Sequence, residues 1–229
     1  MDGVDKIFAP LKGRPLLAWT VATFENNPLV DEIVVAVHRQ AIQQGRALAQ
    51  TDGWKKVSQV CRGGQRRQDS VREALWRLGK CDWVLVHDGA RPCIDAGLIE
   101  RGLDAARETG AAIPAMPVVE TVKRGDERAL VTETLDRQGL WLVQTPQVFR
   151  YDILWDAYKD PADEATDDAA LVERRGMPVK LFRGSAKNLK VTLPEDLERV
   201  AAYLPVNPEP PSPAHPEPHI PAHPEPVEG

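Results

Sequence analysis

The chain alternates between short, largely apolar runs and longer segments in which apolar residues recur at helical spacing. The runs at 33–37, 83–87 and 111–118 predict strands buried on both faces of a sheet, and 54–60 predicts a fourth less clearly. Helices are expected over residues 16–24, 40–50, 71–78 and 97–109. This regular succession of strand and helix predicts an α/β fold, with a mostly parallel sheet and helices on both faces.

The apolar period changes to two after residue 118. Residues 119–123 and 129–135 alternate polar and apolar side chains around a turn at Gly125-Asp126, which predicts a β-hairpin. A two-stranded ribbon is only marginally stable by itself in water. We therefore expect a protruding arm over roughly 119–143 that packs on a second copy of the chain, in a homodimer.

Beyond the arm, the pattern predicts short elements and then a proline-rich tail. Thr145 is expected to be exposed beside Pro146. The expected elements are helices over 151–158 and 167–175, strands over 179–182 and 187–192, and a last helix from Pro194 to about Tyr203. Residues 205–229 hold ten of the 20 prolines, so we expect one domain over 1–204 followed by a disordered tail.

The net charge of −5 is concentrated in that tail, which carries four glutamates and no lysine or arginine. The rest of the chain is close to neutral, so neither a nucleic acid nor a membrane surface is expected as a partner. Cys61, Cys81 and Cys93 lack metal-ligand spacing and are typical of reduced thiols. No apolar run is long enough to span a bilayer, and a cytoplasmic protein is expected.

The candidate chemistry follows the predicted strand 83–87. Asp88, Gly89 and Arg91 come directly after it, at the end of a strand where ligands bind in α/β sheets. A carboxylate oxygen suits Mg²⁺, a glycine lets a ligand approach the backbone, and an arginine suits phosphate. The alternative from these residues alone is an ordinary loop in which Asp88 and Arg91 pair on the surface.

Further motifs together resemble a known family, the 2-C-methyl-D-erythritol 4-phosphate cytidylyltransferases. The matching segments are Asp5-Lys6, Pro10-Leu-Lys-Gly-Arg-Pro15, Gly63-Gly64, Arg67-Gln-Asp-Ser70, Val86-His-Asp88-Gly-Ala-Arg91-Pro92, Thr121-Val-Lys123, Asp136-Arg137, Thr145-Pro-Gln147, Thr166-Asp167-Asp168 and Asn188-Leu-Lys190. They run in order over nearly all of residues 3–200. The resemblance implies a Rossmann-like nucleotidyltransferase fold and the transfer of CMP from CTP to methylerythritol phosphate, with release of pyrophosphate.

The resemblance also assigns roles to individual residues. Lys6 would be catalytic and would stabilise the charge on the triphosphate. Gly64, Ser70, Asp88, Gly89 and Arg91 would bind the nucleotide, and Asp88 would also hold Mg²⁺. Thr121, Arg137, Thr145, Thr166 and Lys190 would position the polyol phosphate.

One departure from the family pattern leaves alternatives open. The family has a buried strand and a glycine-rich loop ending in arginine ahead of the segment that matches Asp5-Lys6. We expect the working protein to include such a segment, encoded in frame upstream of Met1. The alternatives are a ribitol 5-phosphate cytidylyltransferase, which shares the chemistry, and a non-catalytic remnant that has lost the nucleotide loop.

Overall fold

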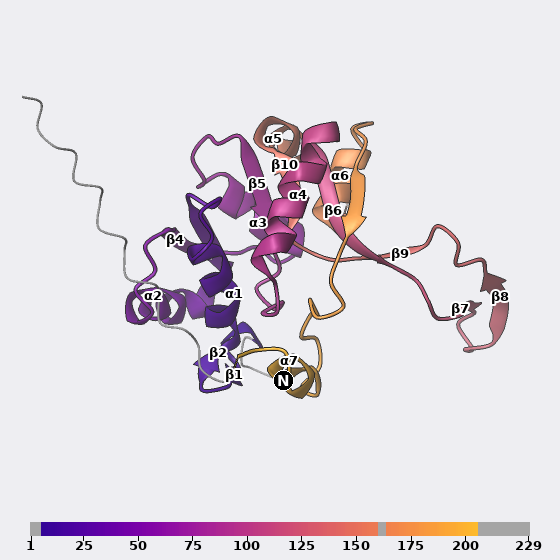
Figure 1. Ribbon diagram of the computed structural model, residues 1–229, viewed down its shortest axis with the longest axis horizontal. Coiled ribbons are helices and arrows are strands. Elements are labelled where there is room, and N and C mark those ends of the chain that lie inside the picture. The colour runs from indigo at the N-terminus through magenta and orange to yellow at the C-terminus, as the bar shows by residue number, and fades with distance from the viewer. Residues whose placement is uncertain (1–5, 160–163, 206–229) are drawn as a thin grey trace, which may run out of the picture.

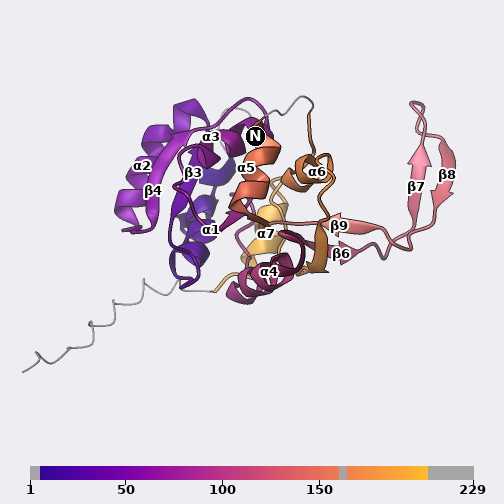
Figure 2. The ribbon, with the colours of Figure 1, turned by 90° about the horizontal axis from the view of Figure 1, so that it is seen from above.

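The computed structural model describes residues 6–159 and 164–205, so the predicted tail lies almost wholly outside it. The described strands form two main sheets (Figures 1 and 2). In the smaller sheet, β3 (Ile33–Val37) pairs in parallel with β4 (Val57–Arg62). The larger sheet has the order β11-β6-β10-β5. Strand β9 pairs with residues 115–117 of β6, past the residues of β6 that pair with β10. Its strands are β5 (Trp83–Val86), β6 (Ala111–Pro117), β9 (Trp141–Val143), β10 (Gln147–Arg150) and β11 (Lys180–Arg183).

The α/β fold class is confirmed, but the larger sheet is mixed rather than mostly parallel. Strand β10 is antiparallel to both β5 and β6, and only β11 pairs with β6 in parallel. The sequence pattern did not predict β10. Its direction follows from the path of the chain, which leaves along β6, returns beside it as β9 and continues after three residues as β10. A connection that short cannot include the crossover that a parallel neighbour requires.

Helices cover both faces of the larger sheet, as its buried strands require. Side chains alternate between the two faces of a strand. Accordingly, Val84 and Val86 of β5 pack with Leu75 on one face, whereas Leu85 packs with Phe24 on the other. The helices are α1 (Leu16–Glu25), α2 (Ile42–Thr51), α3 (Arg67–Leu75), α4 (Ala96–Thr109), α5 (Tyr151–Lys159), α6 (Asp168–Glu173) and α7 (Asp196–Ala201).

Most predicted elements are present, and two predictions were wrong. Helix α3 begins at Arg67 rather than at residue 71, with Arg66 at the N-cap. Residues 187–192 form no strand. Their backbone instead binds the loop after β5, where the Val191 N–H donates to the Ala90 carbonyl at 2.8 Å. The remaining short elements are η1 (Lys6–Phe8), β1 (Pro10–Leu11), β2 (Arg14–Pro15) and η2 (Arg39–Ala41).

The predicted hairpin is confirmed as β7 (Val122–Gly125) paired with β8 (Val131–Leu135). It projects well beyond the rest of the chain, joined to it through β6 and β9 (Figure 1). Apolar side chains along this arm are exposed, Val131 to 64% and Leu142 to 58%. Among the described residues no helix is long and apolar enough to cross a membrane.

Candidate functional site

A cluster of charged side chains lies just beyond the carboxyl end of β5, with Asp88 at its centre. One carboxylate oxygen of Asp88 is 3.0 Å from Arg67 Nε, and the other is 3.0 Å from Lys190 Nζ and 3.4 Å from Arg91 Nε. Burial by itself would raise the pKa of Asp88, but Arg67 and Lys190 lower that pKa well below its ordinary value. Asp88 is therefore ionised at neutral pH and is outnumbered by the cations that it contacts.

Arg67 is fixed from its other side by a buried carboxylate at the start of α6. Its Nη1 lies 2.7 Å from Oδ2 of Asp168, which is fully buried. The Tyr158 hydroxyl donates to the other oxygen of Asp168 at 2.5 Å. Arg67 thus joins the starts of α3 and α6 to the end of β5.

His87 and Thr145 link the end of β5 to the start of β10. The Asp88 N–H donates to Thr145 Oγ1 at 3.1 Å, and that hydroxyl lies 3.0 Å from His87 Nδ1. His87 Nε2 lies 3.1 Å from the Arg91 carbonyl. A neutral imidazole protonated on Nε2 satisfies all three contacts, with the Thr145 hydroxyl donating to Nδ1. Burial favours this neutral form and lowers the pKa of His87 to about 4.

This geometry corrects the expectation that Thr145 is exposed, since only 4% of Thr145 is accessible. Its hydroxyl is engaged by the end of β5. Its carbonyl accepts from Nδ2 of the buried Asn188 at 2.7 Å. The Asn188 carbonyl in turn accepts from Arg91 Nη1 at 2.8 Å. Thr145 therefore holds the loops of the site together, and this hydrogen bonding explains why 187–192 lies against the site as a loop.

The glycine pair before α3 makes a tight turn that leads into the site. Ser70 Oγ accepts from the Gly64 N–H at 3.1 Å. A Cβ at Gly64 would lie 2.2 Å from the Asp69 Cβ, and one at Gly63 would lie 2.7 Å from Ser70 Oγ. Glycine is therefore required at position 64 for this turn to close, whereas a Cβ at position 63 would displace the Ser70 hydroxyl that holds the turn.

Lys6 and Thr166 lie on segments that reach the cluster. Ile7, next to Lys6 in η1, would be 3.6 Å from a Cβ at Gly89, so η1 lies against the loop after β5. Thr166 is exposed, two residues before α6. The preceding Ala165 N–H donates to the Gln68 side chain in α3 at 2.7 Å.

Thr121 and Arg137 lie away from the cluster around Asp88. Both are exposed at the base of the hairpin, Thr121 just before β7 and Arg137 just after β8. Arg137 Nη1 donates to the Val119 carbonyl within the arm. The arm projects away from the rest of the chain (Figures 1 and 2). One chain therefore brings together most of the predicted site residues but not these two.

The sequence analysis gave no role to four residues that the structure places in the site, namely Arg67, His87, Asp168 and Asn188. All four lie inside the motifs quoted above. Nothing in the pattern separates them from their neighbours, because their contacts join segments that are 21 to 101 residues apart.

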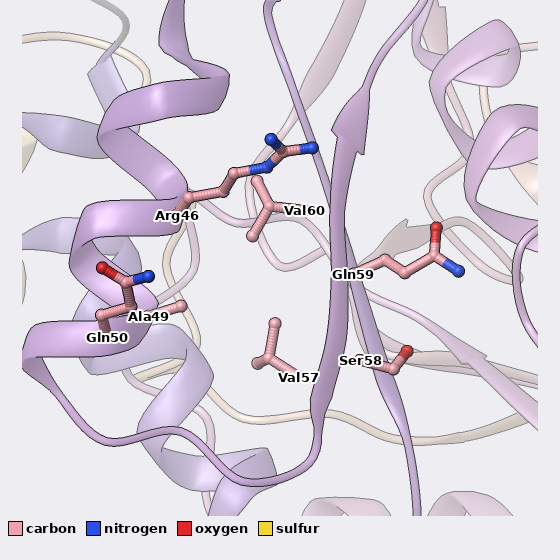
Figure 3. A pocket seen from close by; sticks show the side chains of 7 residues that line it. All are labelled: Arg46, Ala49, Gln50, Val57, Ser58, Gln59 and Val60. Carbon is pink, nitrogen blue, oxygen red and sulfur yellow. The ribbon is translucent and has the colours of Figure 1, made fainter.

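Two carboxylates, Asp88 and Asp168, lie at this site, and Asp168 is buried against Arg67. The described side chains form no cluster of three metal-ligating groups. Mg²⁺ commonly uses only one or two protein carboxylates and takes its other ligands from phosphates and water. Ionised Asp88 therefore fits such an ion. A separate hollow of about 280 Å³ between α2 and β4 contains none of the predicted site residues (Figure 3).

Comparisons with known proteins show the family of the chain. Residues 1–205 match the family described as IspD: 2-C-methyl-D-erythritol 4-phosphate cytidylyltransferase. A protein of that name from Dehalococcoides mccartyi strain 195 is 47% identical over 197 residues, which cover 86% of this chain and 87% of the relative. One from Bacillus licheniformis is 39% identical over 205 residues, 88% of each chain.

Solved structures give the same result. The crystal structure of 2-C-methyl-D-erythritol 4-phosphate cytidylyltransferase from Thermus thermophilus matches with a TM-score of 0.75 at 36% identity, covering 86% of this chain and 92% of that one. The 4-diphosphocytidyl-2C-methyl-D-erythritol synthase from Anaerococcus prevotii matches with a TM-score of 0.78 at 27% identity, covering 89% and 91%. The chain therefore belongs to the 2-C-methyl-D-erythritol 4-phosphate cytidylyltransferase family of nucleotidyltransferases.

Proposed function

We propose that the chain transfers CMP from CTP to 2-C-methyl-D-erythritol 4-phosphate and releases pyrophosphate. The observation that carries the proposal is the cationic cluster around Asp88, at the carboxyl end of β5, in a chain of this family. Two phosphorylated substrates must meet in this reaction. Cations fixed in position offset the repulsion between the two anions and the charge that builds up on the transferred phosphorus.

The residues divide into two groups in this proposal. Gly64, Ser70, Gly89 and Arg91 border the nucleotide, and Lys6 stabilises the charge on its triphosphate. Thr166 and Lys190 face the polyol phosphate, whose oxygen attacks the α-phosphorus in line with the leaving pyrophosphate. Thr145 supports this pocket through its bonds to His87 and Asp88 rather than through a free hydroxyl.

Asp88 would hold Mg²⁺ together with the phosphates of CTP. When bound, the ion would neutralise phosphate charge. Lys190 would be displaced from the Asp88 carboxylate by Mg²⁺ more readily than Arg91, because the Lys190 side chain is 40% exposed and that of Arg91 is 12% exposed. Arg67 would keep the carboxylate oriented throughout, since Asp168 fixes it from behind.

The active form in this proposal is a homodimer in which Thr121 and Arg137 complete the partner's site. Support comes from their position on an arm that projects from the chain with exposed apolar residues. The proposed location is the cytoplasm, where free Cys61, Cys81 and Cys93 would remain reduced.

The test is to incubate the full-length protein with CTP, Mg²⁺ and one polyol phosphate at a time, and to follow pyrophosphate release. Release with methylerythritol phosphate and little with ribitol 5-phosphate is expected. The reverse preference would assign the chain to ribitol phosphate. No release with either, from protein that is folded, would indicate a non-catalytic remnant.

A further inference from the structure

Two buried glutamines flank Thr145 where the chain passes from β9 to β10. Gln144 is 9% exposed and Gln147 is 1% exposed. A buried amide is destabilising unless its polar atoms are paired. Both amides are paired at their oxygen and at their nitrogen, and every partner lies at least 20 residues further along the chain. The segment around Thr145 therefore holds two other segments through these side chains.

Gln144 holds the segment that follows β11. Its Nε2 donates to the Ser185 carbonyl at 2.9 Å, and its Oε1 accepts from the Ser185 N–H at 3.1 Å. Further along this segment, the Asn188 side chain donates to the Thr145 carbonyl. Lys190 follows two residues later, and its ammonium group reaches the charged cluster described above. The backbone that leads to Lys190 is thus fixed at two points.

Gln147 holds the start of α6. Its Nε2 donates to Asp167 Oδ2 at 2.7 Å, and its Oε1 accepts from the Ala169 N–H at 3.1 Å. The other oxygen of Asp167 accepts from the Ala170 N–H and caps the helix. Thr166, just before this cap, is exposed. The backbone that carries Thr166 is therefore fixed while its side chain remains accessible.

The two amides belong to one short piece of backbone, so they fix the two segments relative to each other. Thr145 lies between them, and its hydroxyl accepts from the Asp88 N–H. Lys190 and Thr166 are therefore held against the same four residues that contact the loop carrying Asp88. Phosphate binding needs such fixed spacing, because charge-assisted hydrogen bonds are about 2.7–2.9 Å long. A displacement of about 1 Å can cost about 100-fold in rate.

We propose that Gln144 and Gln147 are positioning residues that set the spacing between Lys190 and Thr166 for the phosphate group of the polyol substrate, without contacting it. Gln144 acts through Lys190, and Gln147 acts through Thr166. The inference rests on the proposed function, since that function assigns Lys190 and Thr166 to the polyol phosphate. A purely structural role for the glutamines would lower the stability of the fold and leave the KM for the polyol phosphate unchanged.

The experiment uses Gln144→Met and Gln147→Met, because methionine has a volume similar to that of glutamine but keeps neither hydrogen bond. Asp167→Ser is a milder second variant, since serine can still cap α6 but is too short to reach Gln147. The matched control is Asn27→Ala. Asn27 is 3% exposed, and its Oδ1 accepts from the Leu29 N–H just beyond α1. Its loss should destabilise the fold without affecting either segment.

The readouts are the melting temperature and the KM values for methylerythritol phosphate and CTP, measured by pyrophosphate release. Calorimetry adds the Kd for methylerythritol phosphate in the presence of a CTP analogue that cannot transfer CMP. Both methionine variants and Asp167→Ser should raise the KM and Kd for the polyol phosphate about tenfold or more. The KM for CTP should not change. Asn27→Ala should lower the melting temperature and change neither KM.

Double variants test which residue each glutamine acts through. Gln147→Met added to Thr166→Ala should raise the KM for the polyol phosphate far less than it does alone, because the residue that it positions is already lost. Gln144→Met added to Lys190→Ala should behave in the same way. Gln147→Met added to Lys190→Ala should keep its full effect.

Wild-type KM and Kd values for the polyol phosphate in all three single variants would overturn the proposal. An equal rise in Asn27→Ala, or an equal rise in the KM for CTP, would also overturn it, as would additive effects in the two matched double variants. If the methionine variants do not fold, Asp167→Ser decides. A wild type that binds methylerythritol phosphate but releases no pyrophosphate would contradict the proposed function, and the calorimetric Kd alone would then decide this inference. Absence of binding by folded wild type would overturn both.

Discussion

At the residue scale, one buried carboxylate holds several segments in place. The Asp88 carboxylate forms ion pairs with Arg67 of α3, with Arg91 in its own loop and with Lys190. Its backbone N–H donates to the Thr145 hydroxyl. A buried ion pair of this kind contributes little net stability compared with apolar packing. Removing one partner is nevertheless strongly destabilising, because it leaves the other charge buried and uncompensated. The Arg67–Asp168 pair behind Asp88 is the clearest case.

We predict that Asp168→Ala lowers the free energy of unfolding by about 3–5 kcal/mol. The substitution leaves Arg67 without its buried partner and the Tyr158 hydroxyl without an acceptor. Urea denaturation measures the change. The control is Asp104→Ala, which removes an exposed pair with Arg107 and should cost less than about 1 kcal/mol. Equal losses for the two variants would contradict the role given to Asp168.

His87 makes stability depend on pH. Its pKa falls to about 4 in the folded chain from an ordinary 6.5, so between these values the unfolded chain binds the extra proton. Stability from this group is complete above pH 6.5 and is lost as the pH falls towards 4. We expect the wild type to lose about 1–2 kcal/mol between pH 7 and pH 5 relative to His87→Gln. Urea titrations at the two pH values measure this difference. Parallel losses in the two proteins would contradict it.

Lys190→Ala should raise the KM for the polyol phosphate about 10- to 100-fold, since a charge-assisted contact contributes about 1.5–3 kcal/mol. CTP affinity should change little. Lys187→Ala in the same loop is the matched control, because Lys187 is exposed and forms no ion pair among the described side chains. Weaker CTP binding with an unchanged polyol KM would place Lys190 in the nucleotide pocket instead.

At the element scale, the arm is only marginally stabilised by its own contacts. Among the described residues, β7 and β8 pair only with each other, and Val131, Leu142 and Trp141 along the arm are exposed. Such an isolated ribbon needs another surface. Exposed apolar side chains in a row are typical of an interface.

We predict that Leu142→Glu converts the protein from a dimer to a monomer at micromolar concentration and speeds hydrogen exchange in β7 and β8. The introduced charge would be buried against a partner. Light scattering measures the mass. Trp76→Glu is the control, since Trp76 is 53% exposed at the end of α3, away from the arm, and should remain dimeric. A fully active wild-type monomer would rule out the interface.

At the scale of the whole molecule, a site built from two chains predicts complementation. Arg137→Ala and Asp88→Asn should each be inactive alone, because the first damages the arm and the second the body. Mixed dimers should recover activity, since one of their two sites then combines an intact body with an intact arm. Pyrophosphate release after unfolding and refolding the two variants together measures the recovery. Absence of recovery in confirmed mixed dimers would show that the arm serves its own chain.

The sequence by itself determined the local elements, the arm and the family. Apolar runs and helical spacing are patterns of residues that lie close together in the sequence. Elements β3, β5, α1 and α4 could therefore be predicted from the pattern. The motifs also located Asp88, Arg91 and Lys190. Strand β10 escaped prediction because its length and direction are set by the strands on either side of it.

The tertiary structure alone decided which of these residues meet. Arg67 joins Asp88 to Asp168, and Asn188 joins Arg91 to Thr145, across separations that no periodicity encodes. Burial of the Thr145 hydroxyl and the neutral state of His87 follow from those contacts.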